Sequence, residues 1–516
     1  MSDTLYVAGD LSGIQDYVLS VSTAGGGQAR RLRARSFYVQ VIEEIASRIV
    51  AKEFGIRWEE AVVLQGGGQF LLRLPASAQM EQRLQEVRER LEPELYRETR
   101  AELALTLASG CSLEEVLSRK EREKRRLWAS RMTANDHWDA SALSQEPLGA
   151  SPCKICGRQA ATHTQWDDEE EIRVCARCYD DTQIGKLLPT ASSLELCSSG
   201  GDFQVLGRGL RFNPSTPAAG VQPLHAPRLH VPADATFKDI AEKAQGDNLL
   251  AVFKADVDSM GAKLGEMQRR DPSLASLRSF SRDLDNFFSR QVQGKLHSGA
   301  WQWVYTIYSG GDDLLLVGPW NVMLDFAEEV HRDFMAGPGN RYGLTLSAGI
   351  ALTNYRVPIR HGVEQADLLL DCAKGRAQPP ETRGNTPNSR AGGAPEPPKD
   401  RCAALGWVWK WERHSAILNQ AKQIKQWIDD GVCPRTMIHR LLSLANRQDP
   451  LRSAHWAYEV GRNFPKASAP SPKSREFRAW GETVLAEILE NTGATRELAV
   501  ELRYALIASR LRRENS

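Results

Sequence analysis

The segment YTIYSGGDDLLLV, residues 305–317, decides the fold, because two apolar strand-like runs flank a glycine-rich corner followed by two aspartates. A tight hairpin needs residues without side-chain obstruction at its corner, and Gly310 and Gly311 meet that need. Asp312 and Asp313 are poor strand formers and repel each other. Bound divalent cations would relieve that repulsion. The segment therefore predicts a β-hairpin that carries a metal site.

An earlier strand, LLAVFKADVDSMG at residues 249–261, supplies two more carboxylates. Asp256 and Asp258 are two positions apart, which puts both on the same face of a strand. In a βαββ sheet the first strand lies beside the hairpin, so we expect Asp256, Asp312 and Asp313 to converge on two magnesium ions. Such a pair stabilises the attacking oxygen and the leaving pyrophosphate in phosphoryl transfer. A surface hairpin with a solvated acidic turn is the alternative, and the paired carboxylates favour the catalytic interpretation.

Several residues near these aspartates are candidates for binding the nucleotide. Gly261 and Gly265 open a helix-like stretch whose amides could hold phosphate oxygens, although an ordinary helix start explains them too. Lys374 ends a predicted helix and could reach a phosphate or complement the helix dipole. Five more residues complete the predicted nucleotide-binding set. They come from the corner of this hairpin and from the first part of the chain: Ser309, Gly310, Gly311, Ser12 and Arg35.

The order of elements recurs in the first part of the chain, which indicates an internal duplication. Asp10 aligns with Asp256, and the run GGGQ at residues 66–69 aligns with GGDD at 310–313. We expect a helix from about residue 36 to 54, and a long polar helix from about 78 to 107. The predicted fold is α+β, with two ferredoxin-like βαββαβ domains. Chance similarity between two common patterns is the alternative.

Two CxxC pairs predict a structural zinc site. Cys153 and Cys156 are separated from Cys175 and Cys178 by eighteen residues, within the usual window for four-cysteine zinc binding. Four thiolates leave no open position for catalysis, so the role is structural. The other five cysteines are scattered, and we expect them at core or neutral positions.

A basic cluster, Arg30, Arg31, Arg33 and Arg35, precedes the expected helix at residue 36. It could bind the phosphates of a nucleotide or RNA. A solvated helix N-terminus is the alternative, but cations are unfavourable at that end of a helix.

Composition sets the outer limits of these predictions. The 516 residues carry a net charge of +1, so nucleic-acid contacts must come from local patches. The N-terminus lacks the features of a signal peptide, and no apolar run has the length of a membrane span, so we expect a cytoplasmic protein. We expect a first palm at 1–110, a helical linker and zinc module at 111–200, a catalytic palm at 201–405 and a helical domain at 406–516. Residues 378–399 read as a mobile loop.

The motifs, taken in order, resemble the large polymerase/cyclase subunit of type III CRISPR effector complexes, which act in antiviral defence. They are GDLSGIQ at 9–15, LRARSFY at 32–38, the two CxxC pairs, KADVDSMG at 254–261 and SGGDD at 309–313. The resemblance implies two palm domains with ATP between them, and synthesis of cyclic oligoadenylates with magnesium (or manganese) when target RNA binds. It also implies a guide RNA and backbone, small and guide-end-capping protein subunits as partners.

Two departures from that family pattern lead to further expectations. The first palm begins at the N-terminus with no HD nuclease domain before it, so we expect a variant without that domain that does not cut DNA. The first palm also has Gly68 and Gln69 where the second has aspartates, so we expect it to bind ATP without metal-assisted attack. The alternatives are a stand-alone diguanylate- or adenylate-cyclase-like enzyme, and a catalytically silent scaffold of an RNA-guided complex.

Overall fold

The computed structural model describes most of the chain. The residues left undescribed are 1–3, 21–26, 77–78, 133–150, 168–169, 192, 198–199, 213–221, 224–231, 233–234, 271–274, 298, 312, 378–398, 447–450, 467, 470, 491–494 and 511–516. Asp312 and nearly all of the predicted loop at 378–399 therefore lie outside the described residues.

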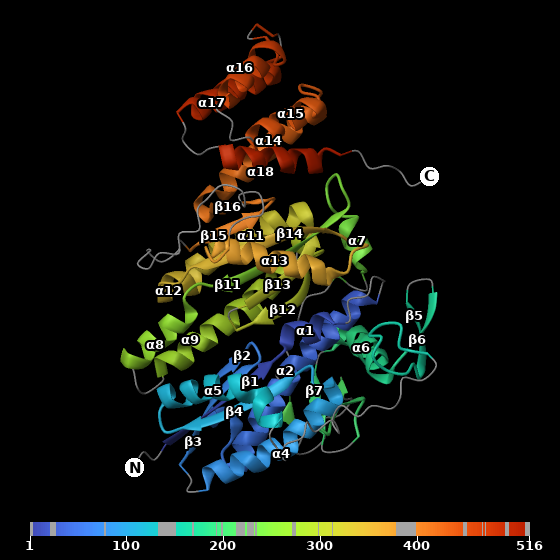
Figure 1. The fold of residues 1–516 in the computed structure, drawn as a ribbon, viewed down its shortest axis with the longest axis vertical. Coiled ribbons are helices and arrows are strands. Elements are labelled where there is room, and N and C mark those ends of the chain that lie inside the picture. The colour runs from blue at the N-terminus through green and yellow to red at the C-terminus, as the bar shows by residue number, and fades with distance from the viewer. Residues whose placement is uncertain are drawn as a thin grey trace. The chain divides into compact units, whose positions relative to one another are not determined.

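The first sheet has the strand order β2-β3-β1-β4, which is the order of a ferredoxin-like βαββαβ unit (Figure 1). β1 pairs with β3 and with β4, both antiparallel, and Asp10 faces Gln69 in the first of these ladders. We call β2 and β3 with their glycine corner the first hairpin. The elements of this part are β1 (Thr4–Ser12), α1 (Ile14–Leu19), α2 (Gln28–Glu53), α3 (Trp58–Ala61), β2 (Val62–Gly66), β3 (Gln69–Pro75), α4 (Met80–Thr99), β4 (Ala104–Gly110) and α5 (Leu113–Met132).

Two boundaries differ from the sequence prediction. The polar helix expected to continue to residue 107 ends at Thr99, and the chain then forms β4. Arg100 and Ala101 both take left-handed φ values, 56° and 59°, which break the helix and turn the chain into the strand. The helix expected to begin at residue 36 begins at Gln28, because it continues through the arginine cluster.

The second sheet repeats the same order and extends it: β12-β13-β11-β14-β15-β16. β11 pairs antiparallel with β14, and β14 pairs parallel with β15. We call β12 and β13 the second hairpin. The elements are α7 (Phe237–Ala241), β11 (Leu249–Val257), α8 (Met260–Arg270), α9 (Ala275–Asp285), η4 (Asn286–Val292), α10 (Gln293–Leu296), η5 (Gly299–Trp301), β12 (Tyr305–Gly310), β13 (Asp313–Pro319), α11 (Trp320–Phe334), η6 (Met335–Gly339), α12 (Asn340–Tyr342), β14 (Leu346–Asn354), α13 (Ile359–Ala373), β15 (Arg401–Ala404) and β16 (Trp407–Lys410).

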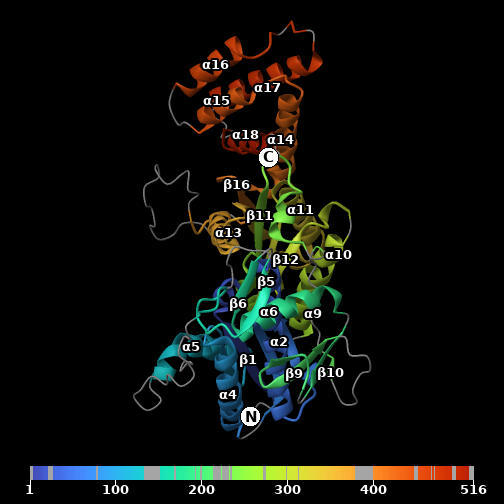
Figure 2. The same cartoon turned by 90° about the vertical axis from the view of Figure 1, so that its right-hand side faces the viewer.

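The cysteine segment forms a small module with a hairpin and a helix, which Figure 2 shows grouped together. A further four-stranded sheet, in the order β10-β7-β9-β8, follows it in the chain. The elements are β5 (His163–Asp167), β6 (Glu170–Val174), α6 (Ala176–Leu187), η3 (Leu188–Thr190), β7 (Leu194–Cys197), β8 (Phe203–Val205), β9 (Arg208–Phe212) and β10 (Gln222–Pro223).

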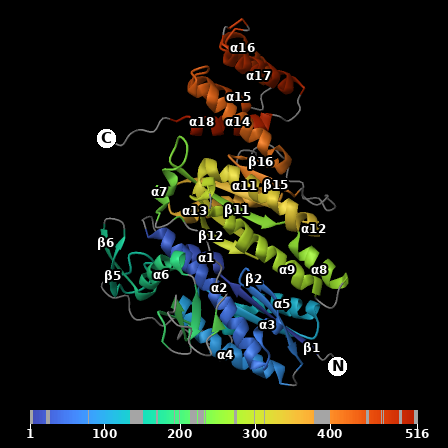
Figure 3. The same ribbon diagram turned by 180° about the vertical axis from the view of Figure 1, so that it is seen from behind.

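The C-terminal part is helical, as predicted, but begins later than residue 406, since β15 and β16 belong to the second sheet. Its helices, visible in Figure 3, are η8 (Trp411–Arg413), α14 (His414–Asp429), α15 (Arg435–Ala445), α16 (Arg452–Arg462), α17 (Pro472–Leu489) and α18 (Thr495–Ala508). Buried aromatic rings hold them together: Trp427 packs edge-on against Phe477, and Phe464 stacks on Phe477 with centroids 4.4 Å apart. None of the described helices combines the length and apolar character that crossing a lipid bilayer requires.

The chain folds into two compact units. The first comprises Met1–Lys238, Ser259–Leu315 and Pro358–Arg360, and the second comprises Asp239–Asp258, Leu316–Val357 and His361–Ser516. The apolar core of the first unit lies under the first sheet, where Val7, Leu72 and Ile42 are fully buried. In the second unit, Phe253, Ile350 and Phe326 play the same part.

Candidate functional site: the acidic end of strand β11

The two predicted carboxylates lie at the end of strand β11, Asp256 within it and Asp258 directly after it, and a buried lysine contacts them. The Asp256 side chain is 23% exposed, whereas Asp258 is 2% exposed. Lys374 follows the last residue of α13, and its ammonium forms an ion pair with Asp256 and lies 4.0 Å from Asp258 Oδ1. The structure thus places Lys374 beside the aspartates, as the predicted site requires.

Asp258 is held in one orientation by three donors. Its Oδ2 accepts hydrogen bonds from Thr345 Oγ1 at 2.8 Å, from Ser347 Oγ at 2.9 Å and from the backbone N–H of Asp400 at 3.1 Å. Its Oδ1 is buried and has no hydrogen-bond partner. A buried carboxylate oxygen without a donor is costly unless a cation completes it. This orphaned oxygen accepts no hydrogen bond, although the Lys374 ammonium lies 4.0 Å away, and it fits a divalent cation that prefers oxygen ligands.

A further layer of contacts supports Asp400, which sequence reasoning had not singled out. His331 Nε2 lies 2.7 Å from Asp400 Oδ1, and its ring stacks on Trp411 with centroids 4.6 Å apart. Trp411 in turn donates its indole N–H to the carbonyl of Leu346 at 2.7 Å. The signal in the sequence was weak, because these residues are far apart in the chain and only the fold brings them together.

Lys374 has an unusual environment for an ammonium group. Burial, together with the nearby cations Arg376, Lys399 and Lys254, lowers its pKa to about 8. The opposing carboxylate of Asp256 stabilises the charged form, so the ion pair favours a protonated lysine at neutral pH. The side chain can therefore act as a positive charge next to the acidic pair.

The second hairpin is anchored at its corner. Ser309 is fully buried and donates its hydroxyl hydrogen to the carbonyl of Phe288 at 2.8 Å. That contact gives Ser309 a structural role, and the predicted nucleotide contact through its hydroxyl is not retained. Gly311 takes a left-handed φ of 65°, and Asp313 begins β13. On α8, a Cβ at Gly261 would meet nothing within 4 Å, which leaves its backbone open to a ligand.

In the first sheet, the position that corresponds to Asp256 has different charged neighbours. Asp10 is 1% exposed, and Lys124 and Lys120 from α5 pair with its two oxygens at 2.9 Å and 3.1 Å. Lys120 Nζ also donates to Gln69 Oε1 at 2.9 Å, the residue that faces Asp10 across the sheet. Ammonium groups therefore neutralise this carboxylate without a metal.

A cavity of about 480 Å³ lies beside the end of β1. Ser12 Oγ is buried there and has no hydrogen-bond partner. Arg158 forms an ion pair with Glu102, and Arg360 lies 3.3 Å from Asp16. The residues that line this cavity are Ser12, Gly13, Asp16, Ser20, Glu102, Ala104, Arg158 and Arg360. A predicted nucleotide-contact residue thus faces a cavity with two arginines.

The arginine cluster has a structural role that sequence reasoning missed. Arg35 is 4% exposed, and its guanidinium donates to Asp181 Oδ2 at 2.9 Å and to the carbonyl of Tyr17 at 2.8 Å. Arg33 donates to the carbonyl of Gly185 at 2.8 Å, and Arg31 pairs with Asp167 at 3.4 Å. These arginines lie inside α2 and bind the cysteine module, so the predicted phosphate contact of Arg35 is not retained.

The four cysteines of the two CxxC pairs meet, as predicted. Their sulfur atoms lie within 4.8 Å of one another. Tetrahedral zinc–thiolate geometry needs sulfurs about 3.8 Å apart, and those of Cys156 and Cys175 are 3.9 Å apart. Arg100 points its guanidinium at Cys156 and Cys175, at 3.8 Å and 3.7 Å. A hydrogen bond from the Cys153 thiol lowers the pKa of Cys156 well below its usual range. The cluster therefore fits one metal ion.

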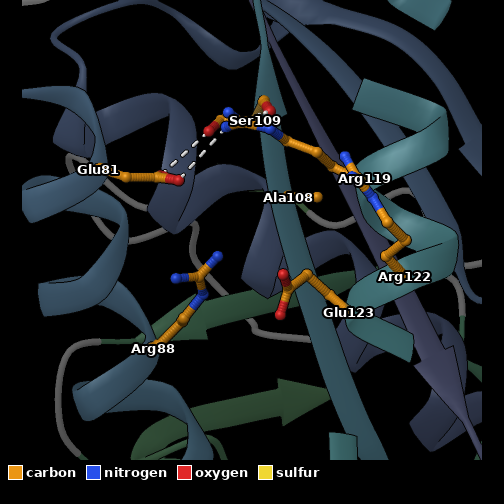
Figure 4. Close-up of a pocket in the computed structure, with 7 residues that line it drawn as sticks. All are labelled: Glu81, Arg88, Ala108, Ser109, Arg119, Arg122 and Glu123. Carbon is orange, nitrogen blue, oxygen red and sulfur yellow. Dashed lines mark hydrogen bonds and ion pairs between the residues drawn. The ribbon is translucent and has the colours of Figure 1, made fainter. Parts of the chain in front are cut away.

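A second cavity of the first unit, about 310 Å³, lies along the edge strand β4 and is lined by residues of α4, β4 and α5. Figure 4 shows Arg88 and Glu81 on one side of β4 and Arg119, Arg122 and Glu123 on the other. Arg88 donates to the carbonyl of Leu107 at 2.5 Å, and Arg119 to that of Ser109 at 3.3 Å. Both arginines thus donate hydrogen bonds to carbonyls of an edge strand. Such contacts protect the edge from pairing with another strand.

Comparisons with known proteins agree with this geometry. A family model of the second palm domain of Cas10/Cmr2 matches residues 249–379, and a model of Csm1 subunit domain B matches residues 4–143. The single-strand-specific deoxyribonuclease Cas10/Csm1 (subtype III-A) of Thermococcus onnurineus is 26% identical over 427 residues, which is 72% of this chain and 53% of that protein. The chain thus spans about half the length of this relative.

Solved structures give the same result for the fold. The Csm1–Csm4 subcomplex of the type III-A CRISPR–Csm interference complex matches with a TM-score of 0.68 and 18% identity, over 99% of this chain and 70% of that one. The Csm1–Csm4 cassette in complex with AMPPNP matches with a TM-score of 0.66, 19% identity and the same coverage.

Fold and acidic site together define a palm-domain protein of type III CRISPR effectors. Within that class, the chain belongs to the Cas10/Csm1 family. The relative carries a deoxyribonuclease name, and the expectation that this chain does not cut DNA stays a prediction.

Proposed function

We propose that this chain polymerises and cyclises ATP into cyclic oligoadenylate messengers by two-metal phosphoryl transfer, when its RNA-guided complex binds target RNA. The observation that carries the proposal is the orphaned Oδ1 of Asp258 beside the partly exposed Asp256. Solved Csm1–Csm4 cassettes have been obtained with AMPPNP and with cA3, which supports adenine nucleotides as ligands of this fold.

Asp256, Asp312 and Asp313 would hold the magnesium ions. Bound metal would stabilise the attacking 3′-oxygen and the leaving pyrophosphate. The place of β13 beside β11 in the sheet supports bringing Asp313 to Asp256. Asp258, locked by Thr345 and Ser347, adds a fourth carboxylate with a fixed orientation.

Other residues of the chain position the donor nucleotide. Lys374 is a buried positive charge beside the acidic pair and would exchange its contact with Asp256 for triphosphate oxygens when nucleotide and metal bind. The backbone N–H groups near Gly261, at the start of α8, would donate hydrogen bonds to phosphate oxygens. Gly310 leaves its part of the hairpin corner free of a side chain, so a nucleotide could approach there, whereas Gly311 rests on the first hairpin.

The first palm would bind the acceptor ATP without metal. Ser12 offers an unpaired hydroxyl to the cavity at the end of β1, and Arg158 and Arg360 supply positive charge there. Asp10 is neutralised by two lysines, so it would not hold a metal there.

The proposed partners are a guide RNA, a target RNA, Csm4-type guide-end-capping subunits, backbone subunits and small subunits. Their support is the match to the Csm1–Csm4 subcomplex. The deciding experiment mixes the purified complex with magnesium, ATP and matched target RNA and identifies the product by mass. Absence of any adenylate product with active target RNA would favour a catalytically silent scaffold, whereas product from the isolated chain without RNA would favour a stand-alone cyclase.

The cysteine cluster would hold one structural zinc ion through Cys153, Cys156, Cys175 and Cys178. Because the arginines of α2 fasten the module to the first palm, Cys153→Ser should lower the thermal stability of the whole first unit. Metal analysis should find one zinc per chain in the native protein and less in the variant. A native protein without stoichiometric zinc would contradict the assignment.

A further inference from the structure

The corners of the two hairpins meet backbone to backbone. A Cβ added at Gly66 would lie 3.3 Å from both Cα and N of Gly311, and one added at Gly311 would lie 3.3 Å from N of Gly67. Gly66, Gly67 and Gly68 have φ values of 143°, 67° and 78°, which side chains rarely allow. The second hairpin therefore rests on a first hairpin whose shape must be held by something other than its own side chains.

Glu43 supplies that support. It lies on α2, is 3% exposed, and its Oε2 accepts a hydrogen bond from the backbone N–H of Gly68 at 2.7 Å. Burial raises the pKa of Glu43 to about 8, although the amides of Gly68 and Gly66 act to lower it. A buried carboxyl group that faces glycine amides, and that no proposed step of the reaction uses, is suited to fixing the corner.

A helix of each repeat contacts the hairpin of the other repeat. α2, which carries Glu43, contacts β12 of the second hairpin, and α9 contacts β2 of the first. Tyr305 at the start of β12 donates its hydroxyl hydrogen to the carbonyl of Ala29 on α2. Each hairpin is thus braced by the helix of the other repeat, so a displacement of the first corner reaches the second.

We propose that Glu43 is a positioning residue for the second hairpin. By holding residues 66–68 it fixes the backbone on which Gly311 rests, and so the placement of the aspartates that follow Gly311. The proposal rests on the proposed nucleotidyl transfer for its effect on rate, but its structural part does not need that activity.

Three variants of the complex separate positioning from general stability. Glu43→Met keeps the volume and removes the acceptor, whereas Glu43→Gln keeps an acceptor for the Gly68 amide. Glu44→Met is the matched control, because Glu44 is a buried carboxylate of the same helix that pairs with Arg48. Glu43→Met should lower the rate of product formation at saturating ATP by about 10- to 100-fold, with little change in KM, since a 1 Å misplacement can cost that much. Glu43→Gln and Glu44→Met should stay near the native rate.

Amide hydrogen exchange of the same complexes reads out the hairpins without any turnover. Glu43→Met should speed exchange at residues 66–68 and also at 305–311, and Glu43→Gln should not. Unchanged exchange at 305–311 in Glu43→Met would overturn the proposal, as would a loss of rate in Glu44→Met equal to that in Glu43→Met. If the native complex forms no product, the proposed function fails, and the exchange data still decide the role of Glu43.

Discussion

The two sheets share one strand order but neutralise their acidic residues differently. In the first, Asp10 is closed in by the ammonium groups of Lys120 and Lys124, and Lys120 also binds Gln69 across the sheet. In the second, Lys374 pairs with Asp256, which stays partly open, and lies 4.0 Å from an Asp258 oxygen that accepts no hydrogen bond. Under the proposed function, the second site holds a metal and the first has replaced it with lysines. A lysine in the metal's place supplies the missing positive charge and keeps the fold stable.

The largest effect is expected from removing the aspartates of the second hairpin. Asp312→Ala combined with Asp313→Ala should abolish adenylate product, a loss of at least about 1000-fold, because nothing else supplies the charge that the metals provide. Product is measured by mass after incubation with target RNA, and native gel filtration checks assembly. Undiminished product would show that the assignment of the active palm is wrong.

Asp258 tests whether the orphaned oxygen matters. Asp258→Asn can satisfy Thr345 and Ser347 with its amide oxygen, but then turns its NH₂ group toward the cation. We expect a loss of about 100-fold and a higher magnesium requirement. A magnesium titration at saturating ATP measures both. Ser347→Ala is the matched control, since it removes one supporting hydrogen bond and should have a smaller effect.

Lys120 tests whether lysine stabilises the buried aspartate of the first sheet. Lys120→Met removes one of two cations from buried Asp10 and leaves Gln69 without its donor. Breaking a buried ion pair costs about 3–5 kcal/mol, and Lys124 should reduce that to roughly 2 kcal/mol. Chemical denaturation measures the loss. The double variant Asp10→Asn with Lys120→Met should recover much of the stability. No change in the single variant would mean that Lys120 does not stand in for a metal.

Glu43 gives the smallest effect, seen as a dependence of stability on pH. Burial raises its folded-state pKa from the ordinary value of 4.5 to about 8, and the nearby Glu44 and Asp285 add to the rise. The folded protein then holds a proton that the unfolded chain releases, so this contribution to stability falls as pH rises from about 4.5 to 8. Between pH 6 and 7 the native protein should lose about 1 kcal/mol more than Glu43→Gln. Parallel curves for the two proteins would contradict the raised pKa.

The local order of residues was enough to predict the parts of this protein that depend on neighbours in the chain. Glycine corners, alternating apolar strands and CxxC spacing are short-range signals, so both hairpins and the meeting of the four cysteines followed from the sequence. The same short-range signals placed Asp256 on β11, but this strand ends at Val257 and Asp258 follows it in a turn.

Only the tertiary structure decided which charges are paired. The arginines at 31, 33 and 35 looked like a phosphate site but are buried against Asp167, Gly185 and Asp181, more than a hundred residues away. The end of α4 at Thr99 was hidden because the residues that follow carry no glycine or proline. Long-range partners such as Lys120 for Asp10 and Asp400 for Asp258 leave no local pattern. A charged side chain reads alike in a sequence whether water, a metal or a distant residue neutralises it, and only the fold distinguishes the three.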